Sequence, residues 1–157
     1  MTPGDARLDT AIAACRQHAT RLRSAMEFLT PLMPLGETGM ASLDDDGVRG
    51  LDQFVYRFGK LQDACGNQLF PALLEVLKEP VREWSMRDRL NRLEQLGFLH
   101  RPDDWDAVRA VRNRLVHEYP DDPARQAAIL ALAWQWANPL LDMAGHVADV
   151  AERESGK

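Results

Sequence analysis

Apolar residues recur at spacings of three and four along almost the whole chain, which is the period of an amphipathic α-helix. The stripe at the start of the chain consists of Leu8, Ile12, Cys15, Ala19, Leu22, Met26 and Leu29. No segment alternates apolar and polar residues over the length of a strand, and no Asn-Gly or Asp-Gly turn joins two β-branched runs. The periodicity therefore predicts an all-α protein.

Proline, glycine and acidic residues indicate where the helices begin and end. Four long helices are expected over residues 5–30, 44–77, 102–118 and 121–151, with one short helix over 86–96. Pro71 lies inside the second segment, so a kink is expected near Leu69. We expect a loop after Pro31 and a frayed polar tail from Glu152. Because the connections are short, the prediction is a single domain over 1–157, an antiparallel up-and-down helical bundle of four long helices plus one short helix.

The composition excludes several classes of protein. A chain of 157 residues buries about 70% of the surface that it exposes when unfolded, so it needs no metal, disulfide or cofactor to fold. No apolar stretch approaches the roughly 18 residues of a membrane span, and the first residues lack a signal-peptide pattern, so a cytoplasmic protein is expected. Cys15 and Cys65 lie in helical patterns without metal-ligand spacing, which predicts two buried free thiols.

Charge gives a mixed indication about partners. The net charge of −5 weighs against a dedicated nucleic-acid binder. Sixteen of the nineteen basic residues are nevertheless arginine, whose planar fork suits phosphate. One basic stretch lies on the first expected helix, between Arg16 and Arg23, and it is interpreted as an ordinary solvated face, with His18 as a surface or packing residue. A second stretch lies in the expected helix over 102–118.

The inward stripe of that fourth helix is not purely apolar. It consists of Trp105, Val108, Arg112, Leu115 and Tyr119, so the seam contains an arginine and a phenol. Arginine is seldom buried unless it is paired. Asn113 and His117, four residues apart, share the adjacent face. Two helical turns therefore carry a cation, an amide, an imidazole and a phenol.

Two interpretations of this cluster are open. Arg and His side chains near a helix C-terminus stabilise the negative end of the helix dipole, which explains them without any chemistry. Alternatively, the set suits cleavage of a phosphodiester, because a neutral imidazole can take the proton of a ribose 2′-hydroxyl and a guanidinium can stabilise charge on the phosphate. Internal attack by that hydroxyl requires no metal. Single-residue physics favours the first interpretation, and Arg112, which lies in the seam well before the final turn, weakens it.

The segment Arg112-Asn113-x-x-x-His117-x-Tyr119 resembles the R-x4-H-x-Y signature of the HEPN superfamily, in particular of the HepT-like toxins. The expected helical bundle, with the motif at the end of a late helix, is also similar, as is the stretch over 54–63. The resemblance covers most of the chain and implies a metal-independent endoribonuclease, without cofactor, that forms a homodimer. It implies Arg112 and His117 as the catalytic pair, Asn113 in support, and Tyr119 as the residue that a nucleotidyltransferase antitoxin modifies with AMP.

Helix geometry sets a condition on this implied site. Residues five apart, such as Arg112 and His117, lie about 140° apart around a regular helix, so they do not converge in one chain unless the helix end distorts. Across a two-fold axis, Arg112 of one subunit can approach His117 of the other, or all four side chains can pack closely together at the dimer axis. We therefore expect a homodimer cleft that binds RNA, with Arg109 and Arg114 as further substrate-binding residues.

Two other functions remain open from the sequence. The chain can be a non-catalytic subunit that binds nucleotide or partners a minimal nucleotidyltransferase. It can also be a homodimeric helical protein in which the motif has only a structural role. Loss of RNA cleavage without loss of stability in His117→Ala separates the nuclease from both.

Overall fold

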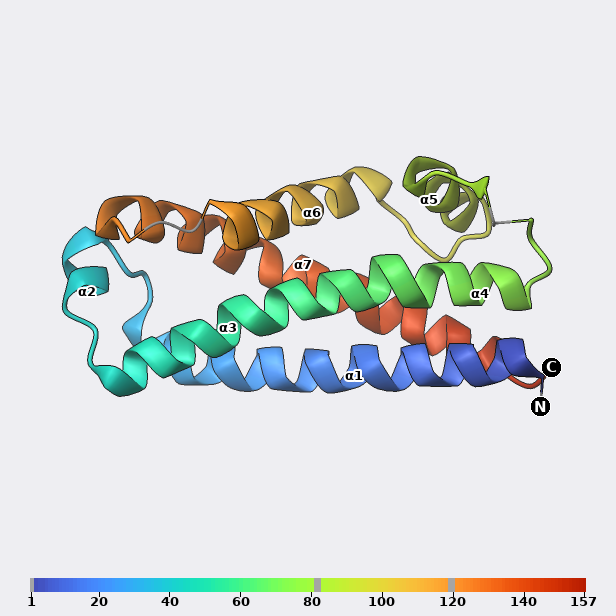
Figure 1. Ribbon diagram of the computed structural model, residues 1–157, viewed down its shortest axis with the longest axis horizontal. Helices are drawn as coiled ribbons and strands as arrows, with labels where there is room; N and C mark the ends of the chain where they lie inside the picture. The colour runs from blue at the N-terminus through green and yellow to red at the C-terminus, as the bar shows by residue number, and fades with distance from the viewer. Residues whose placement is uncertain (1, 81–82, 119–120) are drawn as a thin grey trace.

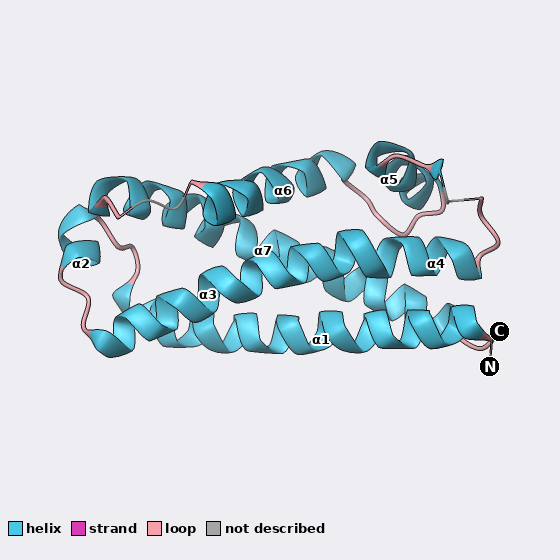
Figure 2. Cartoon of the chain, viewed as in Figure 1, coloured by secondary structure: helices cyan, strands magenta, loops and turns pink. Residues whose placement is uncertain are grey.

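The computed structural model describes residues 2–80, 83–118 and 121–157, and every regular element in these ranges is helical (Figure 1, Figure 2). The elements are α1 (Pro3–Leu29), the 3₁₀ turn η1 (Thr30–Leu32), α2 (Glu37–Ala41), α3 (Asp45–Ala64), the π-helical turn η2 (Cys65–Leu69), α4 (Phe70–Val76), α5 (Met86–Gln95), α6 (Pro102–His117) and α7 (Pro123–Glu154). The prediction of an all-α protein is thus confirmed for these residues. None of the helices in them is long and apolar enough to cross a bilayer.

The long helical segments run back and forth along one axis of the molecule. α1 leads away from the end that holds both termini, and α3, η2 and α4 return as one continuous segment (Figure 1). α6 then runs back beside α3, and α7 returns to the end where the chain began (Figure 1). Because α6 packs mainly on α3 and α7, one of its faces is directed away from the other helices.

Side-chain caps fix where the helices begin. The Thr2 hydroxyl accepts a hydrogen bond from the Asp5 N–H, and the Asp5 carboxylate accepts one from the Thr2 N–H, which together cap α1. Asp44 caps α3 by accepting from the Gly47 N–H at 2.7 Å. Ser85 caps α5, and Asp122 caps α7. These caps satisfy N–H groups that the helix itself leaves without partners, so the starts of these helices follow from the sequence.

The interruption expected near Leu69 takes the form of a single π-helical turn. Pro71 lies in the first turn of α4, directly after η2. A proline cannot donate the hydrogen bond that a regular helix requires at its position, and the wider turn before it accommodates this loss. The segment therefore continues as helix to Val76 and ends before Lys78, whose φ is +65°.

The buried side chains confirm most of the apolar stripes. Cys15 of α1 and Cys65 of η2 are buried free thiols whose Sγ atoms are 3.6 Å apart. Trp105 of α6 is completely buried, with its ring centroid 4.8 Å from that of Phe70. Val48 lies at helical spacing from Leu51 and Val55 of α3, but it is 43% exposed. The ring of Phe28 lies over the bare backbone of Gly50, which turns the Gly50 side of α3 towards α1 and leaves Val48 outside.

Two further expectations need correction. The connection after Pro31 is not all loop, because Met40 is buried and holds the short helix α2 against α7. The tail is not frayed at Glu152, since α7 continues to Glu154. Beyond α7, the Gly156 N–H donates to the Asp5 carboxylate, so contacts with the start of α1 hold the end of the chain.

Candidate functional site

The orientation of α6 is set by its apolar residues. Pro102 occupies the first position of the helix, and two aspartates in the first turn stabilise its positive end. The side chains buried against the core are those of Trp105, Val108, Val111 and Leu115. With these residues fixed inside, the polar residues of the motif are distributed over the two edges and the outer face of α6.

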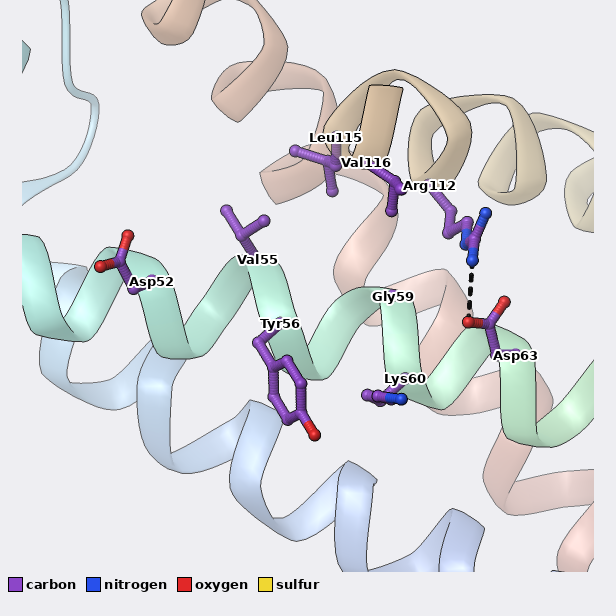
Figure 3. Close-up of a pocket in the computed structure, with 9 residues that line it drawn as sticks. All are labelled: Asp52, Val55, Tyr56, Gly59, Lys60, Asp63, Arg112, Leu115 and Val116. Atoms are coloured by element: carbon purple, nitrogen blue, oxygen red, sulfur yellow. Dashed lines mark hydrogen bonds and ion pairs between the residues drawn. The ribbon is translucent and has the colours of Figure 1, made fainter. Parts of the chain in front are cut away.

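Arg112 lies at the edge of the buried face next to α3 and is not fully inside the seam. Its side chain is 23% exposed, and Nη2 donates to Asp63 Oδ2 of α3 at 2.9 Å (Figure 3). Nη1 donates to Asn113 Oδ1 at 3.2 Å. Nε is buried and has no hydrogen-bond partner within the described residues. The Asp63 carboxylate thus holds the guanidinium in one orientation, and at least one of the remaining N–H groups is left to donate a hydrogen bond to a ligand.

An open groove of about 410 Å³ runs between α3 and α6 beside this ion pair. Leu115 and Val116 of α6, with Val55 of α3, give it an apolar centre (Figure 3). Its other lining residues are Asp52, Tyr56, Gly59, Lys60, Asp63 and Arg112. The groove therefore combines apolar surface with charges of both signs, and the guanidinium of Arg112 lies at its edge.

His117 and Asn113 lie on the outer face of α6. Both are exposed, as is Arg109, and the three follow one another at intervals of four residues. The helix stays regular to its end, because the Glu118 N–H donates to the Arg114 carbonyl at 2.8 Å. The separation of about 140° between Arg112 and His117 therefore holds, and one chain does not bring the two side chains together.

Arg114 lies on the opposite edge of α6, next to α7. Its Nε is 3.5 Å from Glu118 Oε2, and it lines a separate hollow of about 430 Å³ with Arg125 and Ile129. Arg109 and Arg114 are thus directed to different faces of the helix. The remaining motif residue, Tyr119, lies outside the described residues.

Asp63 is the site residue that the sequence analysis did not identify. The signal for it was present, since Asp63 is the only acidic residue between Asp52 and Glu75. A partly buried arginine requires a nearby carboxylate, and the packing of α6 on α3 leaves Asp63 to supply it. The partner could be deduced only after the neighbouring helix was known.

No group of three or more His, Cys, Asp or Glu side chains is arranged to hold a metal ion in the part of the chain that the structure describes. What the described geometry can do is bind an anion at Arg112 and present an imidazole on the adjacent outer face. Comparison of the chain with protein-family models, with curated proteins and with solved structures finds no match in any of the three.

Proposed function

We propose that this protein is a metal-independent endoribonuclease of the HEPN type that works as a homodimer. The observation that carries the proposal is Arg112, which Asp63 holds at the edge of an open groove, on the helix whose outer face also presents the exposed imidazole of His117. The motif from Arg112 to Tyr119 supports this assignment. So does the back-and-forth course of the long helices, which we interpret as a HEPN-like antiparallel bundle (Figure 1).

The proposed reaction is an internal transfer at phosphorus. His117 takes the proton of a ribose 2′-hydroxyl, and the 2′-oxygen attacks the adjacent phosphorus. The bond to the 5′-oxygen of the next nucleotide breaks, and His117, now protonated, gives its proton to that oxygen as it leaves. The products carry a 2′,3′-cyclic phosphate and a 5′-hydroxyl. Arg112 stabilises the negative charge that gathers on the phosphate oxygens during attack, and Asn113 supports its orientation.

A second copy of the chain completes the site in this proposal. Regular helix geometry keeps His117 away from Arg112 of its own chain, so the imidazole comes from His117 of the partner subunit. Val116, between these two positions, is an exposed apolar side chain at 54%. When the outer faces of α6 from two subunits pack against each other around a two-fold axis, Val116 becomes buried. Each His117 then lies towards the groove of the other subunit.

The resemblance also supports a place for this nuclease in a toxin–antitoxin pair in the cytoplasm. We infer that a minimal nucleotidyltransferase is the antitoxin and that Tyr119 is the residue that it modifies with AMP. A bulky, anionic group two residues after His117 would repel the RNA backbone from the cleft. Arg109 and Arg114 are proposed as additional contacts to RNA on either side of the motif.

The test is cleavage of RNA by the purified protein in EDTA, with analysis of the product ends. Wild type is expected to leave 2′,3′-cyclic phosphates, and His117→Ala and Arg112→Ala to abolish this activity. His100→Ala removes another exposed imidazole, and Arg92→Ala removes another partly buried arginine paired with a carboxylate. Both controls are expected to cleave RNA at the wild-type rate.

Two results decide against the nuclease. A wild-type protein that leaves RNA intact but binds a small nucleotidyltransferase is a non-catalytic partner subunit. If His117→Ala unfolds the protein at the assay temperature, the motif has a structural role.

A further inference from the structure

A second group of cations lies at the junction of α1 and α3, outside the motif. Arg57 Nη1 of α3 donates to His18 Nδ1 of α1 at 2.8 Å. Lys60 lies one turn after Arg57 on α3. Burial lowers the pKa of His18, and the charges of Arg57 and Lys60 lower it further. The imidazole is therefore surrounded by positive charge and accepts the arginine hydrogen bond in its neutral form.

No carboxylate neutralises these cations among the residues that the structure describes. Neither Arg57 nor Lys60 forms an ion pair there, and α1 carries no acidic residue between Asp9 and Glu27. Asp63, on the neighbouring turn of α3, is already bound to Arg112. Cations that lie together without a counter-charge repel one another, and an anionic ligand that binds between them removes this cost.

The aromatic ring of Tyr56 lies among the same cations. The ring is 54% exposed, with Arg57 Cζ at 5.2 Å and Lys60 Nζ at 5.6 Å from its centroid. Both cations lie over the ring, and the part of the ring that stays exposed adds the second contact that a nucleotide needs, a flat apolar face for the base beside positive charge for the phosphate. A tyrosine without cations nearby would lack the contact to phosphate, and an isolated surface lysine would lack the contact to the base.

The Tyr56 ring also borders the groove that holds Arg112. Tyr56, Lys60 and Asp63 of α3 all line this groove; Asp63 reaches across to Arg112, while the Tyr56 ring points away from α6 (Figure 3). A nucleotide chain with one phosphate at Arg112 can thus continue over α3 to the Tyr56 ring. We propose that Tyr56, Arg57, Lys60 and His18 form a binding site for single-stranded RNA, in which a base stacks on Tyr56 and the neighbouring phosphates contact Arg57 and Lys60.

The site takes single strands because a base inside a duplex is already stacked on its neighbours and has no free face for the ring. This inference rests on the proposed function, because the RNA strand bound at Tyr56 is the same strand that the proposed nuclease presents to Arg112. It also revises the interpretation of His18 as a plain surface or packing residue. His18 instead fixes the orientation of Arg57 from the adjacent helix.

The experiment measures the binding of a fluorescent single-stranded RNA that carries 2′-O-methyl sugars throughout and so resists cleavage, because no free 2′-hydroxyl is left to attack the phosphate. Tyr56→Ala is expected to weaken binding about tenfold, because a stacking contact is lost, whereas Tyr56→Phe keeps the ring and wild-type affinity. Lys60→Gln is expected to weaken binding at low salt and to reduce the salt dependence by about one phosphate contact. Arg49→Gln, an exposed arginine on α3 paired with Asp46, is the matched control and is expected to bind like wild type.

Three outcomes overturn the proposal. The first is equal affinity of Tyr56→Ala and Tyr56→Phe for the single strand. The second is a duplex of the same sequence that binds as tightly as the single strand. The third is a Tyr56→Ala variant that no longer forms a dimer while each chain keeps its RNA affinity, which makes the ring an interface residue. The result remains separate from the nuclease assay. A wild type that binds through Tyr56 without cleaving RNA supports this site and contradicts the proposed nuclease, and the reverse pattern contradicts this site alone.

Discussion

Removal of the Asp63 carboxylate tests whether its ion pair with Arg112 holds the candidate site in place. Asp63 Oδ2 is 2.9 Å from Arg112 Nη2, and the two side chains are 33% and 23% exposed. The pair of Asp46 and Arg49 on α3 is a control of nearly equal length, at 2.8 Å, but its side chains are 76% and 74% exposed. A difference between the coupling energies of the two pairs therefore reports the effect of burial.

The expected magnitude follows from that difference in exposure. Exposed ion pairs contribute about 0.2–1 kcal/mol because water screens them, and removal of one partner from a fully buried pair costs about 3–5 kcal/mol. Asp63 and Arg112 lie between these limits, so we expect a coupling energy of about 1–2 kcal/mol, against about 0.3 kcal/mol for Asp46 and Arg49. If Asp63→Ala loses this pairwise energy and little else, the Tm of a domain of this size falls by about 2–8 °C.

The assay is urea unfolding of the variants in two double-mutant cycles. One cycle replaces Arg112 and Asp63 with alanine, singly and together, and the other replaces Arg49 and Asp46 in the same way. RNA cleavage by Asp63→Ala is expected to fall about tenfold, because the guanidinium loses the contact that fixes its direction. Equal coupling energies in the two cycles would refute the reasoning about burial. A wild-type cleavage rate in Asp63→Ala would refute the positioning role.

Three further outcomes are expected. Gly145→Ala is expected to stabilise α7 by about 0.5–1 kcal/mol, since nothing lies within 4 Å of the added methyl group. Gly66→Ala is expected to destabilise the fold by about 1–3 kcal/mol, because its methyl group meets the buried Trp105 ring at 3.0 Å. Urea unfolding measures the free-energy change of both variants. The contact with Cys15 and burial raise the pKa of the Cys65 thiol, so native protein at pH 8 reacts with a thiol reagent far more slowly than unfolded protein. Hydrogen bonds from Thr2 and Gly156 lower the pKa of Asp5 below its ordinary value of 3.8. The Asp5 carboxylate therefore stabilises the folded protein above pH 3.8, and this contribution is lost as the pH falls through the lowered pKa. Thermal unfolding from pH 5 to 2 should show this contribution in wild type and not in Asp5→Asn.

Local signals were sufficient to predict every helix except the short helix α2. The caps at Asp44, Ser85 and Asp122 and the positive φ of Gly97 depend on side chains or backbone within a few residues, so the sequence alone identifies them. Apolar spacing identified Trp105 and Leu115 as core residues for the same reason. Helix α2 was missed because Met40 is its one buried residue, and a single residue has no periodicity.

Contacts between helices could not be predicted in the same way. The ion pair of Arg112 with Asp63 and the hydrogen bond of Arg57 with His18 join residues 49 and 39 positions apart. Each requires the rotation of one helix against another, which the whole core determines. Val48 shows the consequence, since it is exposed while Gly50 of the same helix packs against the ring of Phe28. The motif residues could therefore be named from the sequence, while their partners could not.

The central claim is that a complete site takes Arg112 from one subunit and His117 from the other. Mixing Arg112→Ala with His117→Ala, after brief unfolding and refolding together, tests it most directly. Half of the random dimers then contain one intact site of two, so the mixture should recover about a quarter of wild-type RNA cleavage, although each variant alone is inactive. A mixture that stays as inactive as its components would contradict a shared site.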